Sequence, residues 1–239
     1  MDSKFSSMNE LERKIMHCSL CTRLVAYRAQ VSEEKKCVYS DWDYWGKPVP
    51  GFGDPDARLL IVGLAPAAHG SNRTGRMFTG DLPNGASVWL MRSLFRNGFA
   101  NQPESLHQND GLKLTFAWMT AAVRCAPPAN KPTGEEFVNC SNYLREEMRL
   151  LESVRIIVPL GLQAFDAVLK ALAWMGAEIP RPKPKFGHGK RISLPGMPTI
   201  LCCYHTSRQN TNTGRLSEAG LDSIFREARS LSDLDVAKA

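Results

Sequence analysis

The amino-acid sequence predicts an α/β protein, a three-layer α/β/α sandwich with a central four-stranded parallel sheet. Two observations support this fold class. Four short apolar runs have the length of buried strands, at residues 58–62, 114–123, 154–159 and 198–204. Each run is followed by a loop and then by a segment with helical spacing. Strands that alternate with helices in this way form parallel sheets with helices on both faces.

The length and composition fit one domain. The chain has 239 residues, of which 43% are hydrophobic, and this is enough to bury one full core. We therefore expect a single domain over residues 1–239, with an N-terminal segment of about residues 1–56. No apolar stretch reaches the length of a membrane span, and the first residues lack the apolar core of a signal peptide. The sequence thus predicts a cytoplasmic protein without membrane contact, and we expect a monomer.

The net charge of +6 favours a polyanionic partner such as DNA. Lysine and arginine recur beside aromatic residues and prolines, as in RPKPKF at residues 181–186. A basic composition is also common on ordinary solvated surfaces. The charge therefore supports a nucleic-acid partner only if a binding motif agrees with it.

The most distinctive stretch is the glycine-rich segment 63–81, GLAPAAHGSNRTGRMFTGD, which directly follows the first apolar run. It contains neither GxxxxGK[ST] nor GxGxxG, which argues against a nucleotide-binding P-loop or a dinucleotide fold. Its small residues allow backbone amides to approach a ligand closely. Arg73 and Arg76 supply positive charge, and Phe78 offers a flat apolar face. An ordinary surface loop is the alternative interpretation.

Helices are expected between the strands and at the N-terminus. Ser87 is a plausible N-cap and Gly98 a stop signal for one of them, and Thr133 with Glu136 forms a capping box for another. Pro159 should mark the end of the third strand, because proline cannot donate to a sheet ladder. The expected helices cover residues 8–17, 22–36, 87–97 and 133–151, with two more ending near residues 175 and 231, while 39–56 and 176–197 are expected to be irregular.

Four unusual loops each follow a strand: GLAPA, CAPPANKP, PLG and YHTSRQNTNTG. The carboxyl ends of parallel strands meet at one edge of the sheet, where ligands bind in open α/β folds. The sequence therefore predicts that these loops form one site.

The seven cysteines suggest a metal site, since disulfides are rare in cytosolic proteins. Cys18 and Cys21 form a CxxC motif that can place both sulfurs on one metal, and Cys125 and Cys140 have fourteen residues between them. The CxxC motif alone is compatible with a redox dithiol, zinc or an iron–sulfur cluster. Cys202 and Cys203 lie within an expected strand, where buried structural thiols are the better interpretation.

Together these motifs resemble the uracil-DNA glycosylase superfamily, and specifically its family-5 (type B), iron–sulfur branch. The residues that carry the resemblance are the 63–81 segment, Cys18-x-x-Cys21 with Cys125 and Cys140, and the 205–214 segment HTSRQNTNTG, which span most of the chain. The resemblance implies a repair enzyme that excises uracil, and other deaminated or damaged bases, from DNA and leaves an abasic site. It also implies a [4Fe–4S] cluster held by Cys18, Cys21, Cys125 and Cys140.

The resemblance assigns the residues that bind the base. A duplex hides the glycosidic bond, so the nucleotide must be flipped into a pocket that stacks on the base and hydrogen-bonds to it. Phe78 matches the family's stacking position, and Gly63, Ala65 and Ala67 match its base-binding loop. Cleavage leaves negative charge on the departing base, which preorganised donors stabilise. His205 matches that donor.

The resemblance also indicates which residues position the attacking water and which residue affects the choice of base. Other branches carry a polar residue in the first motif, whereas residues 66–68 (PAA) offer none. The implied substitute is the carboxylate of Asp81, helped by Asn130. Ala121 stands where other branches carry an asparagine that recognises uracil, so we expect a broader range of bases. No lysine occupies a matched site position, which predicts a monofunctional hydrolase without a lyase step.

The expected DNA contacts are the side chains of Arg73, Arg76, Lys131, Ser207 and Arg208.

Simpler roles remain open for several of these residues. Asp81 could cap a turn, Asn130 could shape the proline-rich turn, and Arg208 could be a solvated surface charge. His205 could be a core histidine with satisfied hydrogen bonds.

Two other classes of protein remain open as well. A non-catalytic nucleic-acid-binding protein whose four cysteines hold zinc is the main alternative, and an iron–sulfur electron carrier is a third. The electron carrier does not explain the positive charge or the four converging loops.

Overall fold

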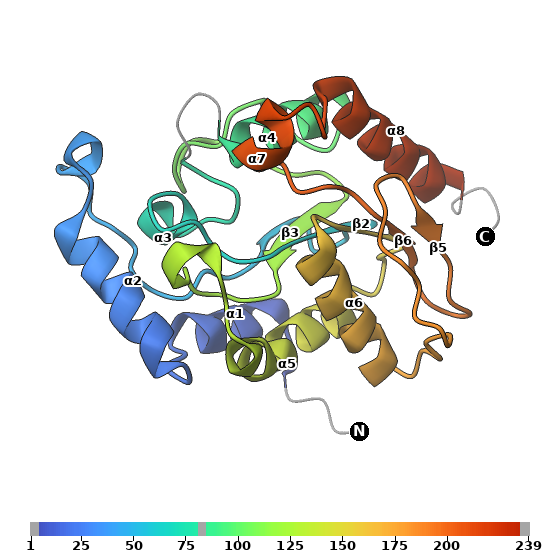
Figure 1. Cartoon of the computed structure of the whole chain (residues 1–239), viewed down its shortest axis with the longest axis horizontal. Helices are drawn as coiled ribbons and strands as arrows, with labels where there is room; N and C mark the ends of the chain where they lie inside the picture. Colours follow the sequence, from blue (N-terminus) through green and yellow to red (C-terminus); the bar gives the residue numbers. More distant parts are fainter. Residues whose placement is uncertain (1–4, 81–84, 235–239) are drawn as a thin grey trace.

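The computed structural model describes residues 5–80 and 85–234 (Figure 1). Its centre is a six-stranded sheet with the strand order β1-β3-β2-β4-β6-β5. The four parallel strands are β2 (Leu59–Gly63), β3 (Ala117–Ala121), β4 (Ile156–Pro159) and β6 (Thr199–Leu201). The strands β1 (Phe52–Gly53) and β5 (Arg191–Ile192) pair antiparallel at the two edges.

The predicted parallel core is confirmed, whereas the expectation of a four-stranded sheet is wrong in this detail. Each edge strand has two residues, which is too short to produce a periodic pattern in the sequence. The strand expected over 114–123 begins only at Ala117, because Phe116 adopts a left-handed backbone conformation with φ of 54°. Pro159 ends β4, as predicted.

The register aligns the carboxyl ends of the strands. Gly63, the last residue of β2, pairs with Ala121, the last residue of β3. On the other side of β2, Val62 pairs with Pro159 at the end of β4. The loops that follow these three strands therefore start from the same edge of the sheet.

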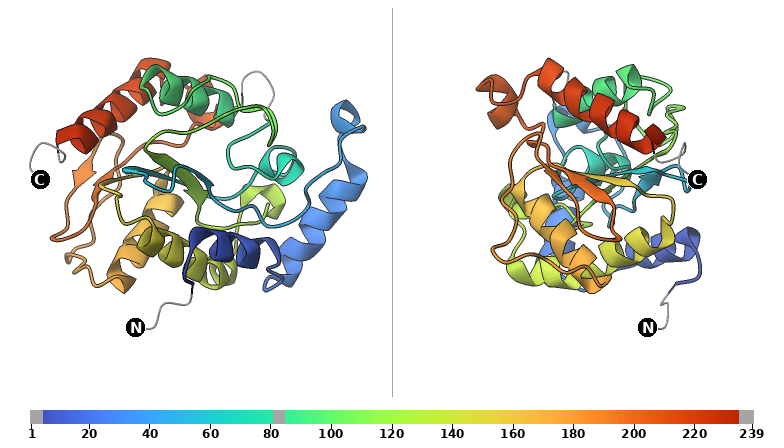
Figure 2. Two further views of the ribbon diagram at one scale, coloured as in Figure 1. Left: turned by 180° about the vertical axis from the view of Figure 1, so that it is seen from behind. Right: turned by 90° about the vertical axis from the view of Figure 1, so that its right-hand side faces the viewer.

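Helices cover both faces of the sheet (Figures 1 and 2). Helices α4 and α8 pack on one face, and α1, α5 and α6 lie on the other. Side chains along β2 alternate between these two cores: Leu59 and Ile61 belong to the first, Leu60 and Val62 to the second. The α-helices are α1 (Met8–Met16), α2 (Thr22–Glu34), α3 (Ser71–Thr74), α4 (Ala86–Arg96), α5 (Gly134–Leu150), α6 (Leu162–Trp174), α7 (Arg208–Asn212) and α8 (Glu218–Leu234).

The helix boundaries follow local signals. The capping box predicted from Thr133 and Glu136 is present at the start of α5. The N-cap of α4 is Gly85 instead of Ser87, and α2 ends at Glu34 because Lys35 has a φ of 48°. None of the helices in the described ranges is long and apolar enough to span a membrane.

Short helical turns occur in four of the segments between the longer helices and the strands. The segment 63–81 contains α3, and the segment after β6 contains α7. Two 3-10 turns, η1 (Cys37–Tyr39) and η2 (Pro128–Asn130), follow α2 and precede α5.

Candidate active site

A cavity of about 850 Å³ opens at the carboxyl edge of the parallel strands. The loop after β2 supplies Leu64 and Phe78, and the loop after β3 supplies Asn130. Gly161, after β4, and His205, after β6, complete the wall. The predicted convergence of four loops is therefore present in the structure.

Phe78 lies across the end of β2. A Cβ atom placed on Gly63 would approach Cζ of Phe78 to 2.7 Å, so the absence of a side chain at Gly63 leaves the space for this ring. Phe78 itself has a φ of 51°, a conformation uncommon for an aromatic residue. Ala65 and Ala67 line the same cavity, whereas Gly63 faces the Cζ tip of the ring and does not line the cavity. The cavity thus has a flat aromatic surface among small residues.

His205 and Asn130 both line the cavity. His205 is half-buried, and its carbonyl oxygen accepts a hydrogen bond of 2.8 Å from Nδ2 of Asn210 in α7. Asn130 is exposed at the end of η2 with a φ of 55°, which an asparagine tolerates better than most residues. Ser207 and Arg208 lie on the wall as well. Asp81, expected to act with Asn130, lies outside the described residues.

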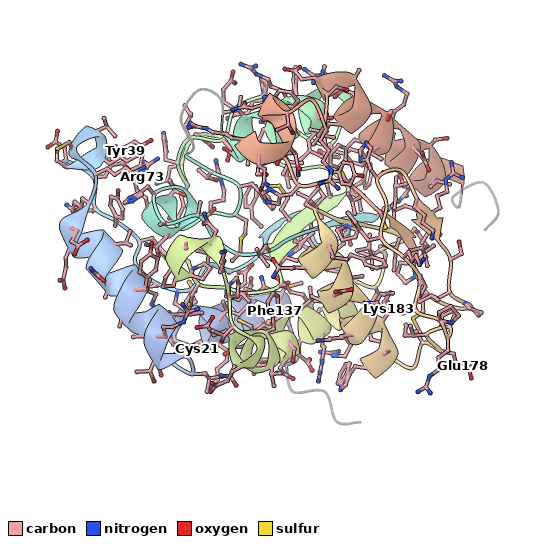
Figure 3. All side chains as sticks on the ribbon, in the orientation of Figure 1. Cys21, Tyr39, Arg73, Phe137, Glu178 and Lys183 are labelled. Atoms are coloured by element: carbon pink, nitrogen blue, oxygen red, sulfur yellow. The ribbon has the colours of Figure 1, made fainter. Side chains whose placement is uncertain are left out.

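Arg73, predicted as a DNA contact, is instead buried in the protein. Its guanidinium carbon lies 3.9 Å from the ring centres of both Tyr39 and Trp42 (Figure 3 marks Arg73 and Tyr39). It also donates hydrogen bonds to the carbonyls of His69, at 2.9 Å, and Gly80, at 2.7 Å. The side chain is 3% exposed, so it holds the loop and does not reach a phosphate on the surface.

Arg76, also predicted as a DNA contact, is buried in the same loop. It forms a bidentate ion pair with Asp110 at 2.6 and 2.8 Å and also bonds to Thr79 and Ser105. Burial alone would raise the pKa of Asp110, but hydrogen bonds from Arg76 and from backbone amides outweigh it and hold that pKa well below its usual value. Both arginines therefore fix the shape of the 63–81 segment.

Lys131 is exposed next to Asn130 but does not line the cavity. Its carbonyl oxygen accepts a hydrogen bond of 3.1 Å from Arg23 in α2. This bond links the loop after β3 to the N-terminal segment.

The cavity residues that were not assigned from the sequence include three with polar or charged side chains, Lys36, Tyr39 and His69. Lys36 and Tyr39 come from the turn after α2, whose position no local pattern reveals. His69 is the single histidine of the 63–81 segment, so its position in that motif could have identified it as a candidate site residue. Burial, together with the nearby positive charges of Lys36 and Arg73, lowers the pKa of His69. The Nδ1 atom of His69 lies 3.1 Å from the hydroxyl oxygen of Tyr44.

The described lining of the cavity has a positive character. Lys36 and Arg208 contribute cations, and none of the described lining residues is a carboxylate. A cavity with this lining suits a ligand that carries phosphate groups.

A second pocket brings together the four cysteines of the sequence motif. Cys18 and Cys21, on either side of the turn into α2, share it with Cys125 and Cys140 (Figure 3 marks Cys21). Within the described parts of the chain, no group of three or more His, Cys, Asp or Glu residues is positioned to hold a single metal ion. Cys202 and Cys203 are buried, as predicted, and do not line this pocket, but they follow β6 and do not lie within it, because the strand ends at Leu201.

Hydrogen-bond donors surround these sulfur atoms. Arg28 of α2 donates to Sγ of Cys125 at 3.0 Å, and the amide of Arg124 donates to Sγ of Cys140 at 3.3 Å. Burial raises the pKa of Cys125 to about 11 and that of Cys140 to about 12, so these thiols lose their protons only with a strong cationic partner. The donors fit a group that carries thiolate ligands and negative charge.

The fold and the cavity define a member of the uracil-DNA glycosylase superfamily. The profile of the Uracil DNA glycosylase superfamily matches residues 50–229, and the chain belongs to this family.

Its relatives place it in the type-5 branch. It is 48% identical over 229 residues to the type-5 uracil-DNA glycosylase of Mycobacterium leprae, covering 95% of this chain and 97% of that one. It is 46% identical over 217 residues to the type-5 enzyme of Thermus thermophilus, covering 91% and 94%. A type-4 uracil-DNA glycosylase of Sulfurisphaera tokodaii is 31% identical over 135 residues, which cover 56% of this chain and 52% of that one.

Proposed function

We propose that this protein is a monofunctional type-5 uracil-DNA glycosylase, which flips uracil out of DNA and hydrolyses its N-glycosidic bond. The observation that carries the proposal is the cavity at the carboxyl edge of the sheet. Phe78, Asn130 and His205, from three different loops, all line it. The positive lining suits the DNA strand, and the family membership gives the reaction class.

The proposed reaction begins with binding of the flipped base. The ring of Phe78 supplies a stacking surface, and the small side chains of Ala65 and Ala67 leave room for the base. The bond from C1′ of the sugar to the base nitrogen then breaks, and the base leaves with the electron pair. His205 donates a hydrogen bond to the oxygen of the departing base and so stabilises its negative charge.

Water completes the hydrolysis. Its oxygen bonds to C1′, and one of its protons is released, so that the products are an abasic site and the free base. We assign the positioning of this water to Asn130 and to the carboxylate of Asp81, which also stabilises the positive charge on the sugar. The role of Asp81 is proposed only on the basis of the family resemblance.

The range of bases follows from the small residues of the cavity. Ala121 lines it at the end of β3, and Ala67 and Ala68 line it in the loop after β2. Methyl groups provide no hydrogen bonds that select uracil over related bases. We therefore propose that other deaminated or damaged bases are excised as well.

One lysine, Lys36, lies on the cavity wall although no lysine occupies a matched motif position. A lyase would form a Schiff base between such an amine and C1′ of the abasic site. Borohydride traps that adduct covalently, and a monofunctional hydrolase gives no trapped product.

We also infer that Cys18, Cys21, Cys125 and Cys140 hold a [4Fe–4S] cluster. The support is their common pocket, the donors from Arg28 and Arg124 and the match to the type-5 branch. When bound, such a cluster supplies four iron–thiolate bonds that tie distant chain segments together. Zinc on the same thiolates would leave the protein colourless, whereas the cluster makes it brown.

The oligomeric state and the cellular location are also part of the proposed function. We propose that the enzyme acts on uracil-containing DNA as a monomer in the cytoplasm. The mass of the protein in solution, measured by light scattering with and without DNA, tests the monomer.

The decisive experiment uses labelled duplexes that each carry one candidate lesion. The purified protein is incubated with each duplex, and alkali then cleaves the abasic sites. Alkali-dependent cleavage at uracil is expected, with cleavage at further lesions measuring the range. Intact uracil-containing DNA after prolonged incubation with iron-loaded protein would refute the function.

A further inference from the structure

We propose that the groove between α5 and α6 binds an unpaired nucleotide of the DNA strand next to the flipped base. This proposal rests on the proposed function and extends the DNA-binding surface beyond the cavity. The groove has a volume of about 290 Å³, near the lower end of the range for small-ligand sites, which suits a fragment such as one nucleotide.

The floor of the groove is apolar. Ala122 and Leu144 lie at its base, and Ala167 and Ala171 of α6 form one side. Phe137 of α5 forms part of the opposite side, and Val138 beside it is 70% exposed (Figure 3 marks Phe137). An apolar surface with one aromatic ring is what single-stranded DNA uses to stack its bases without sequence preference.

The rim of the groove is basic. Lys170 is exposed on one side, and Arg145 lies on the other with its guanidinium 5.4 Å from the ring centre of Trp174. The Nε atom of Arg145 is buried and has no hydrogen-bond partner among the described residues. Asp166 is the one carboxylate of the described lining, and Lys183 pairs with it at 2.8 Å. The rim can therefore attract a phosphate.

The groove continues from the active-site cavity. Gln163, in the first turn of α6, lines both of them. Leu162, its neighbour, lines the cavity and is 54% exposed, so the cavity and the groove meet at the exposed first turn of α6. A strand whose flipped nucleotide occupies the cavity thus has an adjoining basic and apolar groove within reach of its neighbouring nucleotide. In intact duplex that neighbour stays stacked and paired, so the groove serves single-stranded or frayed DNA.

The test fills the groove with a large side chain. Ala167→Trp occupies it, and Ala173→Trp is the matched control, because Ala173 is exposed on the same helix and does not line the groove. The probe is a fluorescein-labelled single-stranded oligonucleotide without uracil, and its dissociation constant is measured by anisotropy. Loss of one stacked base corresponds to a loss of affinity on the order of 5- to 150-fold. We expect a loss in this range for Ala167→Trp and less than about a twofold change for Ala173→Trp.

Lys170→Ala provides a second variant that does not disturb the core. For single strands the slope of log affinity against log salt changes by about 0.7 for each phosphate contact removed. We expect that change for Lys170→Ala and none for Lys113→Ala, which replaces an exposed lysine that does not line the groove.

Excision of uracil from duplex DNA separates the two proposals. We expect wild-type rates for both groove variants with duplex substrate. Unchanged single-strand affinity in both variants would overturn the groove proposal while leaving the glycosylase proposal intact, and so would an equal loss with single-stranded and duplex substrates. A wild-type protein that fails to excise uracil from duplex DNA refutes the proposed function instead.

Discussion

Gly63 and Phe78 share a space that one methyl group would fill. The Cβ position of Gly63 lies 2.7 Å from Cζ of Phe78, closer than non-bonded carbon atoms approach one another. Gly63 is the last residue of β2 and is fixed by its pairing with Ala121. The sheet therefore determines where the ring of Phe78 lies in the cavity.

Gly63→Ala should displace this ring. Stacking of a base on an aromatic side chain contributes about 1–3 kcal/mol, so we expect the rate of uracil excision to fall by up to about 100-fold. Single-turnover assays measure this rate. Gly134→Ala is the control, because no atom lies within 4 Å of its Cβ position. Equal rates for the two variants would show that Phe78 does not stack on the base.

Arg73→Lys should impair catalysis without weakening DNA binding. Lysine keeps the charge but loses the guanidinium that contacts the rings of Tyr39 and Trp42 and donates to the carbonyls of His69 and Gly80. A displacement of catalytic groups by about 1 Å costs roughly 100-fold, so we expect kcat to fall by up to this factor with little change in KM.

Arg92→Lys, at an exposed position on α4, is the control for Arg73→Lys. The dependence of DNA affinity on salt distinguishes the two roles of Arg73. A fall of about 0.9 in the log–log slope for Arg73→Gln, which removes the charge, would indicate a phosphate contact and contradict the buried position.

Arg76→Gln should destabilise the fold. It leaves Asp110 buried without its ionic partner, which typically costs about 3–5 kcal/mol in the free energy of unfolding. Urea denaturation at neutral pH measures this loss. Lys113→Gln, which removes an exposed charge, should change the stability by less than about 0.5 kcal/mol.

The same ion pair predicts an acid dependence of stability. Because the folded state lowers the pKa of Asp110 below its ordinary value of 3.8, the unfolded chain binds more protons as the pH falls below that value. The contribution of Asp110 is therefore present above pH 3.8 and is lost as the pH falls toward its folded pKa. Arg76→Gln should lose less stability than the wild type over this acid range.

His205→Ala and Asp81→Ala should each slow base excision. Loss of a charge-stabilising donor costs on the order of 10²–10³ in rate, and loss of an acid–base group roughly 10²–10⁴. Binding to undamaged DNA should remain nearly unchanged, which electrophoretic mobility shifts can measure. His107→Ala, at an exposed position outside the cavity lining, is the control. A wild-type excision rate for Asp81→Ala would contradict the role of this carboxylate. Asn130 or the DNA phosphates would then have to position the water and stabilise the positive charge on the sugar.

Cys140→Ser should remove the brown colour and the broad visible absorbance, together with part of the fold's stability. Cys140 is buried against Cys125 and Tyr143, so loss of its iron bond also loosens the packing of α5. Cys37→Ser is the control, because Cys37 is exposed and does not line the cysteine pocket. Iron content by mass spectrometry and thermal unfolding measure the two effects. A colourless Cys140→Ser protein with unchanged stability and activity would contradict a structural cluster.

Local sequence patterns were sufficient to predict the parallel core. The apolar runs of β2, β3, β4 and β6 and the capping box at Thr133 are contained within short stretches, so their periodicity is visible without a structure. The order and direction of the loops then predict the common edge. His205, Asn130 and Phe78 could be expected in one site because each follows a strand of this sheet.

The buried arginines could not be predicted in the same way. Arg73 turns inward because Tyr39 and Trp42 cover it. Arg76 turns inward because Asp110 pairs with it. These partners lie more than 30 residues before Arg73 and after Arg76 in the sequence. The motif shows only a basic loop, whichever way its side chains point. Lys36 reaches the cavity for a related reason, since the position of α2 depends on packing across the chain.

Helix α2 physically joins the cysteine pocket to the wall of the base cavity. Cys21 precedes its first residue, Arg28 in its middle bonds to Cys125, and Lys36 and Tyr39 beyond its last residue line the cavity. The proposed cluster would therefore anchor the start of the same helix whose far end leads into the cavity wall. A change in how the cysteine pocket holds α2 could be transmitted along one rigid rod to Lys36 and Tyr39, about 15 residues away.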